Sequence, residues 1–268
     1  MSSLGGQVAF ITGAGSGLGA AFARRLAADG AHVVVNDRDE AAAGRTAAEI
    51  GGEVAAFDVT DSASLDAAVD RVATHHGHLD IMINNAGIAP PTDDARTATM
   101  IDNQMKRMLG DVGGLTPTND TLELSDDAFD RMMKVHLYGT FYGMRAALRH
   151  MTPARRGSIV NVSSVLAQRP MPGALHYAAA KAGIIAMTKS TGHEVAAFGI
   201  RVNVVCPGWI DTPLLSPIPD EVKAGIVMQV PAGRLGRPQE VAELVRFLAG
   251  PESSYCNGDV FTASGGFV

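Results

Sequence analysis

The stretch TGAGSGLG, residues 12–19, joins a short apolar run to a segment with helical periodicity. The run is VAFIT (8–12), and the segment is LGAAFARRLAADG (18–30), whose apolar residues recur every three or four positions before a glycine ends it. A strand, a glycine-rich turn and a helix in this order are typical of a dinucleotide-binding βαβ unit. The stretch therefore predicts both the fold class and a first binding site.

The glycines of this turn are spaced differently from the common Gly-x-Gly-x-x-Gly pattern. Gly13, Gly17 and Gly19 follow Gly-x-x-x-Gly-x-Gly, and Leu18 stands where the common pattern has its third glycine. The physical needs are the same: a tight turn, close approach of the backbone to a pyrophosphate, and free N–H groups at a helix N-terminus. The alternative is an ordinary turn, which the position after a first strand disfavours. The expected dinucleotide contacts in the turn are Gly13, Gly15, Ser16, Gly17, Leu18 and Gly19.

Strands and helices alternate along the rest of the chain. The predicted strands are apolar throughout, which is typical of strands buried on both faces. Such alternation builds a parallel sheet with right-handed crossovers. We therefore expect an α/β fold, a single doubly wound (Rossmann-like) domain over residues 1–268 with a mostly seven-stranded parallel sheet flanked by helices. The strands after the first are HVVVND (32–37), EVAAFD (53–58), LDIMINNAG (79–87), GSIVNVSS (157–164), IRVNVVCPG (200–208) and GDVFTASGG (258–266).

The composition excludes several classes of protein. The chain has 268 residues and a net charge of −6, which disfavours nucleic acid and anionic membrane surfaces as partners. No apolar run reaches the roughly 18 residues that span a bilayer, and the N-terminus MSSLGGQVAF lacks the features of a signal peptide. Cys206 and Cys256 form neither a disulfide framework nor a metal motif. We expect a cytoplasmic protein with no metal.

Asp37 ends the second predicted strand, and its carboxylate predicts the choice of cofactor. It can accept hydrogen bonds from the adenosine ribose hydroxyls and would repel a 2′-phosphate. Two alternatives remain. In the first, Asp37 is an ordinary aspartate of the turn before the next helix. In the second, the guanidinium of Arg38 holds the 2′-phosphate of NADP. We favour NAD over NADP. Asp58, which ends the third strand, should then lie near the adenine.

The stretch ALHYAAAKAGI (174–184) places Tyr177 and Lys181 four residues apart in an alanine-rich helix. Residues at this separation share one helix face. The pair is either surface decoration or a proton donor beside a charge that tunes it. Spacing alone does not distinguish the two.

Five motifs in order decide between them. These are TGAGSGLG (12–19), NNAG (84–87), Ser164, YAAAK (177–181) and PGWIDT (207–212). In this combination the chain resembles the classical short-chain dehydrogenase/reductase family nearly from end to end. The resemblance implies an NAD(P)-dependent oxidoreductase of secondary alcohols and ketones, a small-molecule substrate and a homotetramer.

Carried over to this sequence, the resemblance makes Tyr177 the general acid/base, Lys181 its partner and Ser164 the hydroxyl that orients the substrate, with the side chain of Ser163 directed away. A phenol has a pKa of about 10, which a nearby ammonium and a positive nicotinamide ring should lower. Ser164 would donate a hydrogen bond as charge develops on the substrate oxygen. The remaining cofactor contacts implied are Asp58, Val59, Asn85, Ala86, Gly87, Tyr177, Lys181, Pro207, Gly208, Ile210 and Thr212.

The sequence departs from the family in MKVHLYGTF (133–141), where many members have Asn in place of His136. That Asn is thought to hold a water that links the lysine to solvent. His136 either maintains this relay, with a protonation state that depends on pH, or is a packed structural histidine. Both interpretations remain open.

The segment 209–233 follows the Pro207–Gly208 turn and is largely apolar. In the family it forms the substrate loop, so an apolar substrate such as a steroid, a terpenoid alcohol or a 3-hydroxyacyl thioester would fit; ordinary packing is the alternative. An NADP-dependent 3-oxoacyl reductase is the nearest competing function, and a catalytically idle dinucleotide-binding sensor is a further one. The residues behind these expectations are Trp209, Leu214, Leu215, Ile226 and Met228 for apolar contact, and Arg169 or Arg234 for a carboxylate.

Residues 90–120 are longer than this region commonly is in the family, so we interpret them as an insertion. Ile101, Met105, Met108 and Leu109 recur at helical spacing and predict an amphipathic helix of two to three turns that ends at Gly110. Such a short helix must pack on something. It either borders the substrate pocket or forms a subunit contact.

Overall fold

A computed structural model describes residues 4–90 and 94–268. Its centre is one seven-stranded parallel sheet in the order β3-β2-β1-β4-β5-β6-β7, which confirms the predicted doubly wound fold. All the pairings are parallel, so helices must connect the strands across the faces of the sheet. The strands are β1 (Val8–Ile11), β2 (His32–Asp37), β3 (Glu53–Ala56), β4 (Ile81–Asn84), β5 (Gly157–Val162), β6 (Ile200–Pro207) and β7 (Val260–Ala263).

Two hydrophobic cores cover the two faces of the sheet. In β1, Ala9 and Ile11 belong to one core and Val8 and Phe10 to the other, because successive strand side chains point to opposite faces. This two-sided burial is the reason that the strands are apolar throughout. The first core holds α1 (Gly17–Ala28), α2 (Glu40–Ile50) and α9 (Pro238–Ala249), and the second holds α3 (Ser62–His76), α6 (Gly139–Ala154) and the end of α7 (Leu175–Val195).

The position of β1 determines where a ligand can bind. β1 lies between β2 and β4, so the chain leaves it toward one edge of the sheet and later returns on its other side. In doubly wound sheets a crevice opens at this switch point, outside the carboxyl ends of the strands. The turn 12–19 lies there, since it follows β1 directly.

A stretch of π-helix interrupts the helical segment before β5. α5 (Asp126–Met132) continues into the π-helix Met133–Tyr138 and then into α6. Ser125 caps the start of α5 by accepting a hydrogen bond from the Ala128 N–H. Short π-helical stretches are rare and often lie at functional sites. His136 belongs to this one.

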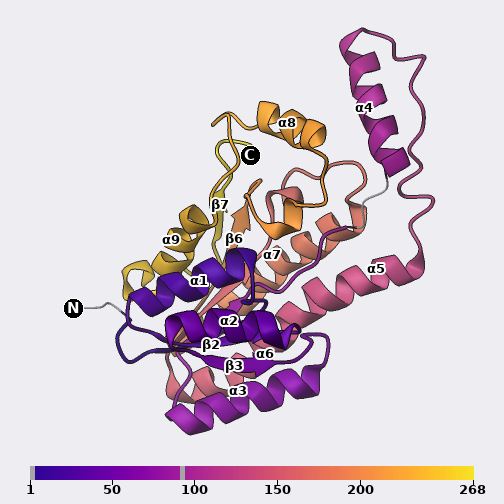
Figure 1. Cartoon of the computed structure of the whole chain (residues 1–268). Coiled ribbons are helices and arrows are strands. Elements are labelled where there is room, and N and C mark those ends of the chain that lie inside the picture. Colours follow the sequence, from indigo (N-terminus) through magenta and orange to yellow (C-terminus); the bar gives the residue numbers. More distant parts are fainter. Residues whose placement is uncertain (1–3, 91–93) are drawn as a thin grey trace.

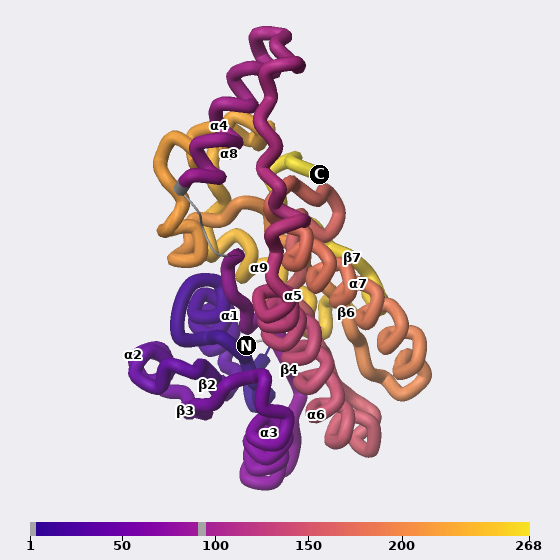
Figure 2. The backbone as a smooth tube through the Cα atoms, turned by 90° about the vertical axis from the view of Figure 1, so that its right-hand side faces the viewer, coloured from indigo at the N-terminus to yellow at the C-terminus, as the bar shows by residue number. Residues whose placement is uncertain are grey.

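The C-terminal end of helix α4 (Asp94–Met108) projects beyond the rest of the molecule in both views (Figures 1 and 2). The helix is longer than the predicted helix, which was placed from Ile101 onward. The returning chain is tied to it through Asn103, whose side chain donates to the Thr116 carbonyl at 2.6 Å and accepts from the Thr116 N–H at 2.8 Å. Residues 91–93 of the predicted insertion lie outside the described residues.

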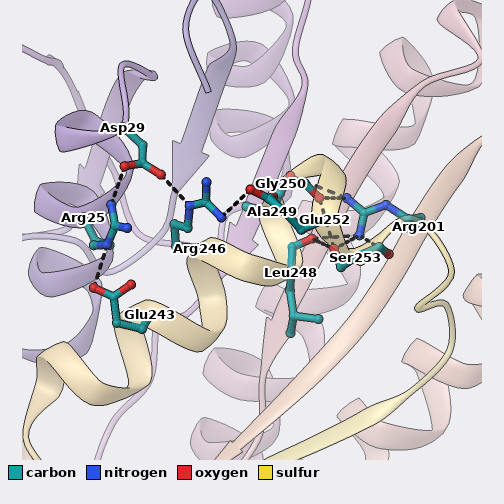
Figure 3. A network of polar contacts seen from close by, with 10 residues as sticks. All are labelled: Arg25, Asp29, Arg201, Glu243, Arg246, Leu248, Ala249, Gly250, Glu252 and Ser253. Atoms are coloured by element: carbon teal, nitrogen blue, oxygen red, sulfur yellow. Dashed lines mark hydrogen bonds and ion pairs between the residues drawn. The ribbon is translucent and has the colours of Figure 1, made fainter. Parts of the chain in front are cut away.

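A polar network joins the first helix to the last (Figure 3). Asp29, which follows α1, forms ion pairs with Arg25 of α1 and with Arg246 of α9. Arg201 of β6 donates to the carbonyls of Leu248 at 2.8 Å and Gly250 at 3.0 Å, which lie at the end of α9 and also accept from Ser253. The network holds α9 against the sheet.

Among the residues that the structure describes, none of the helices combines the length and the apolar composition that a membrane span requires.

Candidate active site

A cavity of about 610 Å³ opens at the carboxyl edge of the sheet. The glycine turn, the ends of β2 to β6 and the segment after β6 surround it, so residues far apart in the sequence meet there. Volumes of this size are typical of sites for cofactors and small molecules. The expected residues that line it are Gly13, Ser16, Gly17, Leu18, Asp37, Arg38, Asp58, Val59, Asn85, Ala86, Gly87, His136, Ser164, Tyr177, Lys181, Pro207, Gly208, Ile210 and Thr212.

Two expected contacts, Gly15 and Gly19, are not among the lining residues. A Cβ atom on Gly19 would lie 2.2 Å from the Gly13 carbonyl oxygen, and one on Gly15 would lie 2.8 Å from the Asp37 carboxylate. These glycines therefore let the turn close on itself and on β2. Gly13 and Gly17 adopt φ angles of +63° and +54°, which favour glycine.

The start of α1 has the features of an anion site. Ser16 is the N-cap residue, but its side chain makes no capping hydrogen bond. The first N–H groups of the helix are therefore not satisfied by that side chain, and the helix dipole favours a negative group there. The turn thus fits the pyrophosphate of a dinucleotide.

Asp37 is held at the end of β2 by backbone donors. Its carboxylate accepts from the Gly15 N–H at 3.1 Å and from the Asp39 N–H at 3.1 Å. On the other side of the turn, the Asn85 amide donates to the carbonyls of Thr12 and Gly13, both at 3.0 Å. The arrangement fixes the turn between β2 and β4, with one carboxylate on the cavity wall and the Arg38 side chain exposed beside it.

Ser164 and Tyr177 meet across the cavity wall. Ser164 follows β5 and caps the short 3-10 helix Val165–Ala167 by accepting from the Leu166 N–H at 3.1 Å. Ser164 and Tyr177 both line the cavity, and the Ser164 side chain acts to lower the pKa of Tyr177. Ser163 instead donates to the Lys181 carbonyl at 2.7 Å and is buried. Only one of the two neighbouring serines therefore faces the phenol.

Lys181 lies behind Tyr177, one helical turn along α7. Its ammonium donates to the Val162 carbonyl at 2.8 Å and lies 5.7 Å from the centre of the Tyr177 ring. Burial lowers the pKa of Lys181 to about 7. Burial also raises the pKa of Tyr177, against the opposing effect of the Ser164 side chain. The lowering of the phenol pKa that we expected from Lys181 is therefore not found, because desolvation is the largest influence on this group.

His136 is packed beneath Tyr177. Its ring meets the Tyr177 ring edge-on, with centres 5.2 Å apart. Its Nε2 lies 2.9 Å from the Ile88 carbonyl oxygen and 3.1 Å from the Ile88 nitrogen, while its Nδ1 is buried with no partner among the described residues. Burial, reinforced by the charge of Lys181, lowers the pKa of His136 well below its usual value. The ring is therefore neutral at physiological pH.

Replacement of His136 by Asn should leave the acid limb of the pH–rate profile unchanged. A group whose pKa lies well below 6.5 carries no proton to lose in the range where the enzyme is assayed. The measurement is kcat/KM from pH 5.5 to 9 for both proteins. A flatter acid limb in the variant would show that His136 titrates and takes part in proton relay.

His176 is a site residue that the sequence analysis missed. It precedes Tyr177 on α7, lines the cavity and is 3% exposed. Both ring nitrogens are buried without a hydrogen-bond partner among the described residues, and burial lowers its pKa. Its place beside Tyr177 was the only signal in the sequence.

Three residues proposed for the substrate lie elsewhere. Met228 is 84% exposed and is not a lining residue. Arg169 donates to the Phe267 carbonyl at 3.0 Å, and Arg234 pairs with Glu240 at 2.7 Å. The apolar wall is formed by Met100, Met171, Trp209, Leu214, Leu215 and Ile226.

Comparisons with known proteins agree with this geometry. The family model "short chain dehydrogenase" matches residues 7–112, and "Enoyl-(Acyl carrier protein) reductase" matches residues 108–268. The chain is 39% identical over 266 residues to cis-4-hydroxycyclohexanecarboxylate dehydrogenase of Sinomonas cyclohexanicum, covering 98% of this chain and 96% of the relative. It is 36% identical over 263 residues to the 3-oxoacyl-(acyl-carrier-protein) reductase of Escherichia coli K12, covering 97% of each.

A solved structure described as ribose-5-phosphate isomerase from Brucella melitensis 16M is also similar, with a TM-score of 0.85 and 34% identity. The match covers 99% of this chain and 93% of that chain. The fold and the dehydrogenase matches make this protein an oxidoreductase that uses a nicotinamide dinucleotide and acts on a CH–OH or keto group of a small molecule. The chain belongs to the short-chain dehydrogenase/reductase family.

Proposed function

We propose that the protein is an NAD(H)-preferring dehydrogenase that interconverts an apolar secondary alcohol and its ketone. The observation that carries the proposal is that Ser164 and Tyr177 lie together on the wall of the cavity, with Lys181 buried behind the phenol. A hydroxyl pair of this kind can hold one substrate oxygen and exchange a proton with it.

The proposed reaction divides the work between these residues. When bound, a nicotinamide dinucleotide would accept the hydride from the alcohol carbon or return it to the ketone. Tyr177 takes the alcohol proton in the oxidation and gives it back in the reduction. Ser164 donates a hydrogen bond to the substrate oxygen, and protonated Lys181 stabilises the phenolate that oxidation requires.

Replacing Asp37 by Ala should shift the cofactor preference toward NADP. A carboxylate on the cavity wall disfavours a 2′-phosphate, since like charges brought together cost several kcal/mol. We expect the ratio of kcat/KM with NADP+ to that with NAD+ to rise at least about tenfold.

Asp37→Asn is the matched control for shape, because it removes the charge and keeps an oxygen for the Gly15 N–H. It should show the same shift if charge is the cause. Better kcat/KM with NADP+ in the unaltered protein would mean that Arg38 determines the preference and that our assignment is wrong.

Replacing Met100 by Ser should raise KM for large apolar alcohols and spare kcat for a small one. Of the methionines in α4, Met100 lines the cavity, whereas Met105 and Met108 are 61% and 79% exposed and do not. This position of Met100 supports a role for the first turns of α4 at the substrate pocket, whereas the two methionines that the sequence pointed to lie away from the cavity.

Met105→Ser is the matched control, and its KM should equal that of the unaltered protein. Equal KM values for all three proteins would remove α4 from the substrate site. Loss of the oligomer in the Met105 variant, measured by light scattering, would assign the exposed face of α4 to a subunit contact. We propose a homotetramer, on the resemblance to the family.

A specific observation favours a second candidate, a 3-oxoacyl reductase. Several relatives carry that activity in their descriptions. A substrate panel separates the two candidates: cyclic and linear secondary alcohols with NAD+, against a 3-oxoacyl thioester with NADH and NADPH. Our proposal requires the highest kcat/KM with an alcohol and NAD+. Turnover of the thioester alone, with NADPH, would support the reductase.

A further inference from the structure

Three potential metal ligands converge at the edge of the sheet farthest along the strands from the cavity. His32 is the first residue of β2, Glu53 is the first residue of β3, and His76 is the last residue of α3. The residues that β2 and β3 contribute to the cavity come from their opposite, carboxyl ends, where Asp37 and Phe57 lie. The cluster is therefore separate from the proposed active site.

The fold brings these side chains to one face. Val34 is in register with Glu53, and His32 lies two residues before Val34. Residues two apart in a strand point to the same face, and Val34 packs into the core that α3 covers. His76 ends α3 over this point, where Gly77 terminates the helix with φ +79°.

The ligand atoms already share one small volume. The Nε2 of His32 lies 2.7 Å from Glu53 Oε1, and the Nε2 of His76 lies 2.8 Å from the same oxygen. All three atoms are within 4.8 Å of one another. An ion between them needs only small side-chain shifts, because zinc–ligand bonds of about 2.0–2.2 Å separate neighbouring ligand atoms by somewhat more than these distances.

We propose that His32, Glu53 and His76 form a site for one divalent transition-metal ion of the Zn²⁺ type. Two imidazoles and one carboxylate are borderline ligands that suit Zn²⁺. The side chains are 35%, 40% and 19% exposed, so water can complete the coordination shell. The site ties β3, the edge strand, to β2 and α3, so the bound ion stabilises this edge of the sheet and does not take part in hydride transfer.

The alternative is a metal-free cluster in which both rings donate to one carboxylate. The metal-bound and metal-free clusters differ in whether the Nε2 atoms of the two histidines carry a proton. The hydrogen-bonded cluster keeps it there, whereas coordination requires a lone pair on both Nε2 atoms and moves the protons to Nδ1. Metal binding must therefore compete with protons for these nitrogen atoms.

Calorimetric titration of ZnCl2 into chelator-treated, tag-free protein at pH 7.5 tests the site. We expect saturable binding of one equivalent, and a rise in Tm with ZnCl2. Glu53→Gln and His76→Gln should each weaken binding at least about tenfold, the scale on which altering a site's ligands or their supports reduces metal affinity. Glu53→Gln keeps an oxygen that can accept from the histidines, so it tests charge and coordination with the least disturbance to folding.

His75→Gln is the matched control. His75 precedes His76 in α3 and meets its ring edge-on at 4.8 Å, but it is not one of the three ligands. The His75→Gln variant should bind Zn²⁺ with the same affinity and stoichiometry as the unaltered protein. Absence of saturable binding in the unaltered protein would overturn the proposal, and so would equal binding by Glu53→Gln. Equal loss in the His75 and His76 variants would also reject it. None of these results would bear on the dehydrogenase assignment, which is tested by turnover.

Discussion

Replacement of Tyr177 by Phe should lower kcat by about a hundredfold to ten-thousandfold, the contribution expected from a positioned general acid/base. The change removes one oxygen and keeps the ring that packs edge-on against His136. The affinity for NADH should stay within about twofold, since the phenol would exchange a proton with the substrate. Steady-state kinetics with an alcohol and NAD+ give kcat, and fluorescence titration gives the NADH Kd.

Tyr138→Phe is the control for this variant. Tyr138 lies at the end of the π-helix and is 47% exposed, so the loss of its hydroxyl should leave kcat unchanged. Retention of a tenth or more of the original kcat by the Tyr177 variant would reject Tyr177 as the proton donor. A parallel loss of NADH binding would point to a structural defect.

Replacement of Lys181 by Met should abolish turnover and yet raise the free energy of unfolding at neutral pH. An ammonium that is fully solvated in the unfolded chain is buried in the folded protein, which lowers its pKa from 10.5 to about 7. A methionine of similar length avoids this cost, which is on the order of a few kcal/mol. The lost hydrogen bond to the Val162 carbonyl offsets part of the gain.

The sign of the pH dependence identifies the cause. Between pH 7 and 10.5 the unfolded chain binds a proton on Lys181 that the folded protein has released, so the stability of the unaltered protein rises with pH in this window. The advantage of Lys181→Met should therefore be full below pH 7 and should disappear as the pH approaches 10.5. Denaturant unfolding of both proteins across this range measures the difference.

Lys189→Met provides the matched control, because Lys189 lies on the same helix and is exposed. Its stability difference from the unaltered protein should be small and should not depend on pH in this way. If Lys181→Met is less stable at pH 7, the ammonium contributes more through its hydrogen bond than burial costs. Activity in that variant would contradict the proposed role of Lys181.

The parallel sheet and the glycine-rich turn at the cavity could be predicted because both depend on local sequence. Strands such as VAFI (8–11) are apolar on both faces, and only a sheet covered by helices on both sides satisfies them. In the turn 12–19, Gly13 and Gly17 adopt positive φ angles that favour glycine, and this preference is a property of each residue by itself. The motif around Tyr177 likewise sets two side chains on one helix face.

The sequence by itself determined the parallel sheet and the glycine-rich turn, because backbone conformation and periodicity are local properties. The proposed proton donor, Tyr177, was identified only through the resemblance of several motifs to a known family. Only the tertiary structure decided which side chains reach the cavity: it brought in His176 and Met100 and left out Met228. The same holds for the opposite edge, where His32 and His76 come from different elements and meet at Glu53. The direction and neighbours of a side chain depend on elements distant in sequence, and packing among these elements fixes them only when the chain has folded.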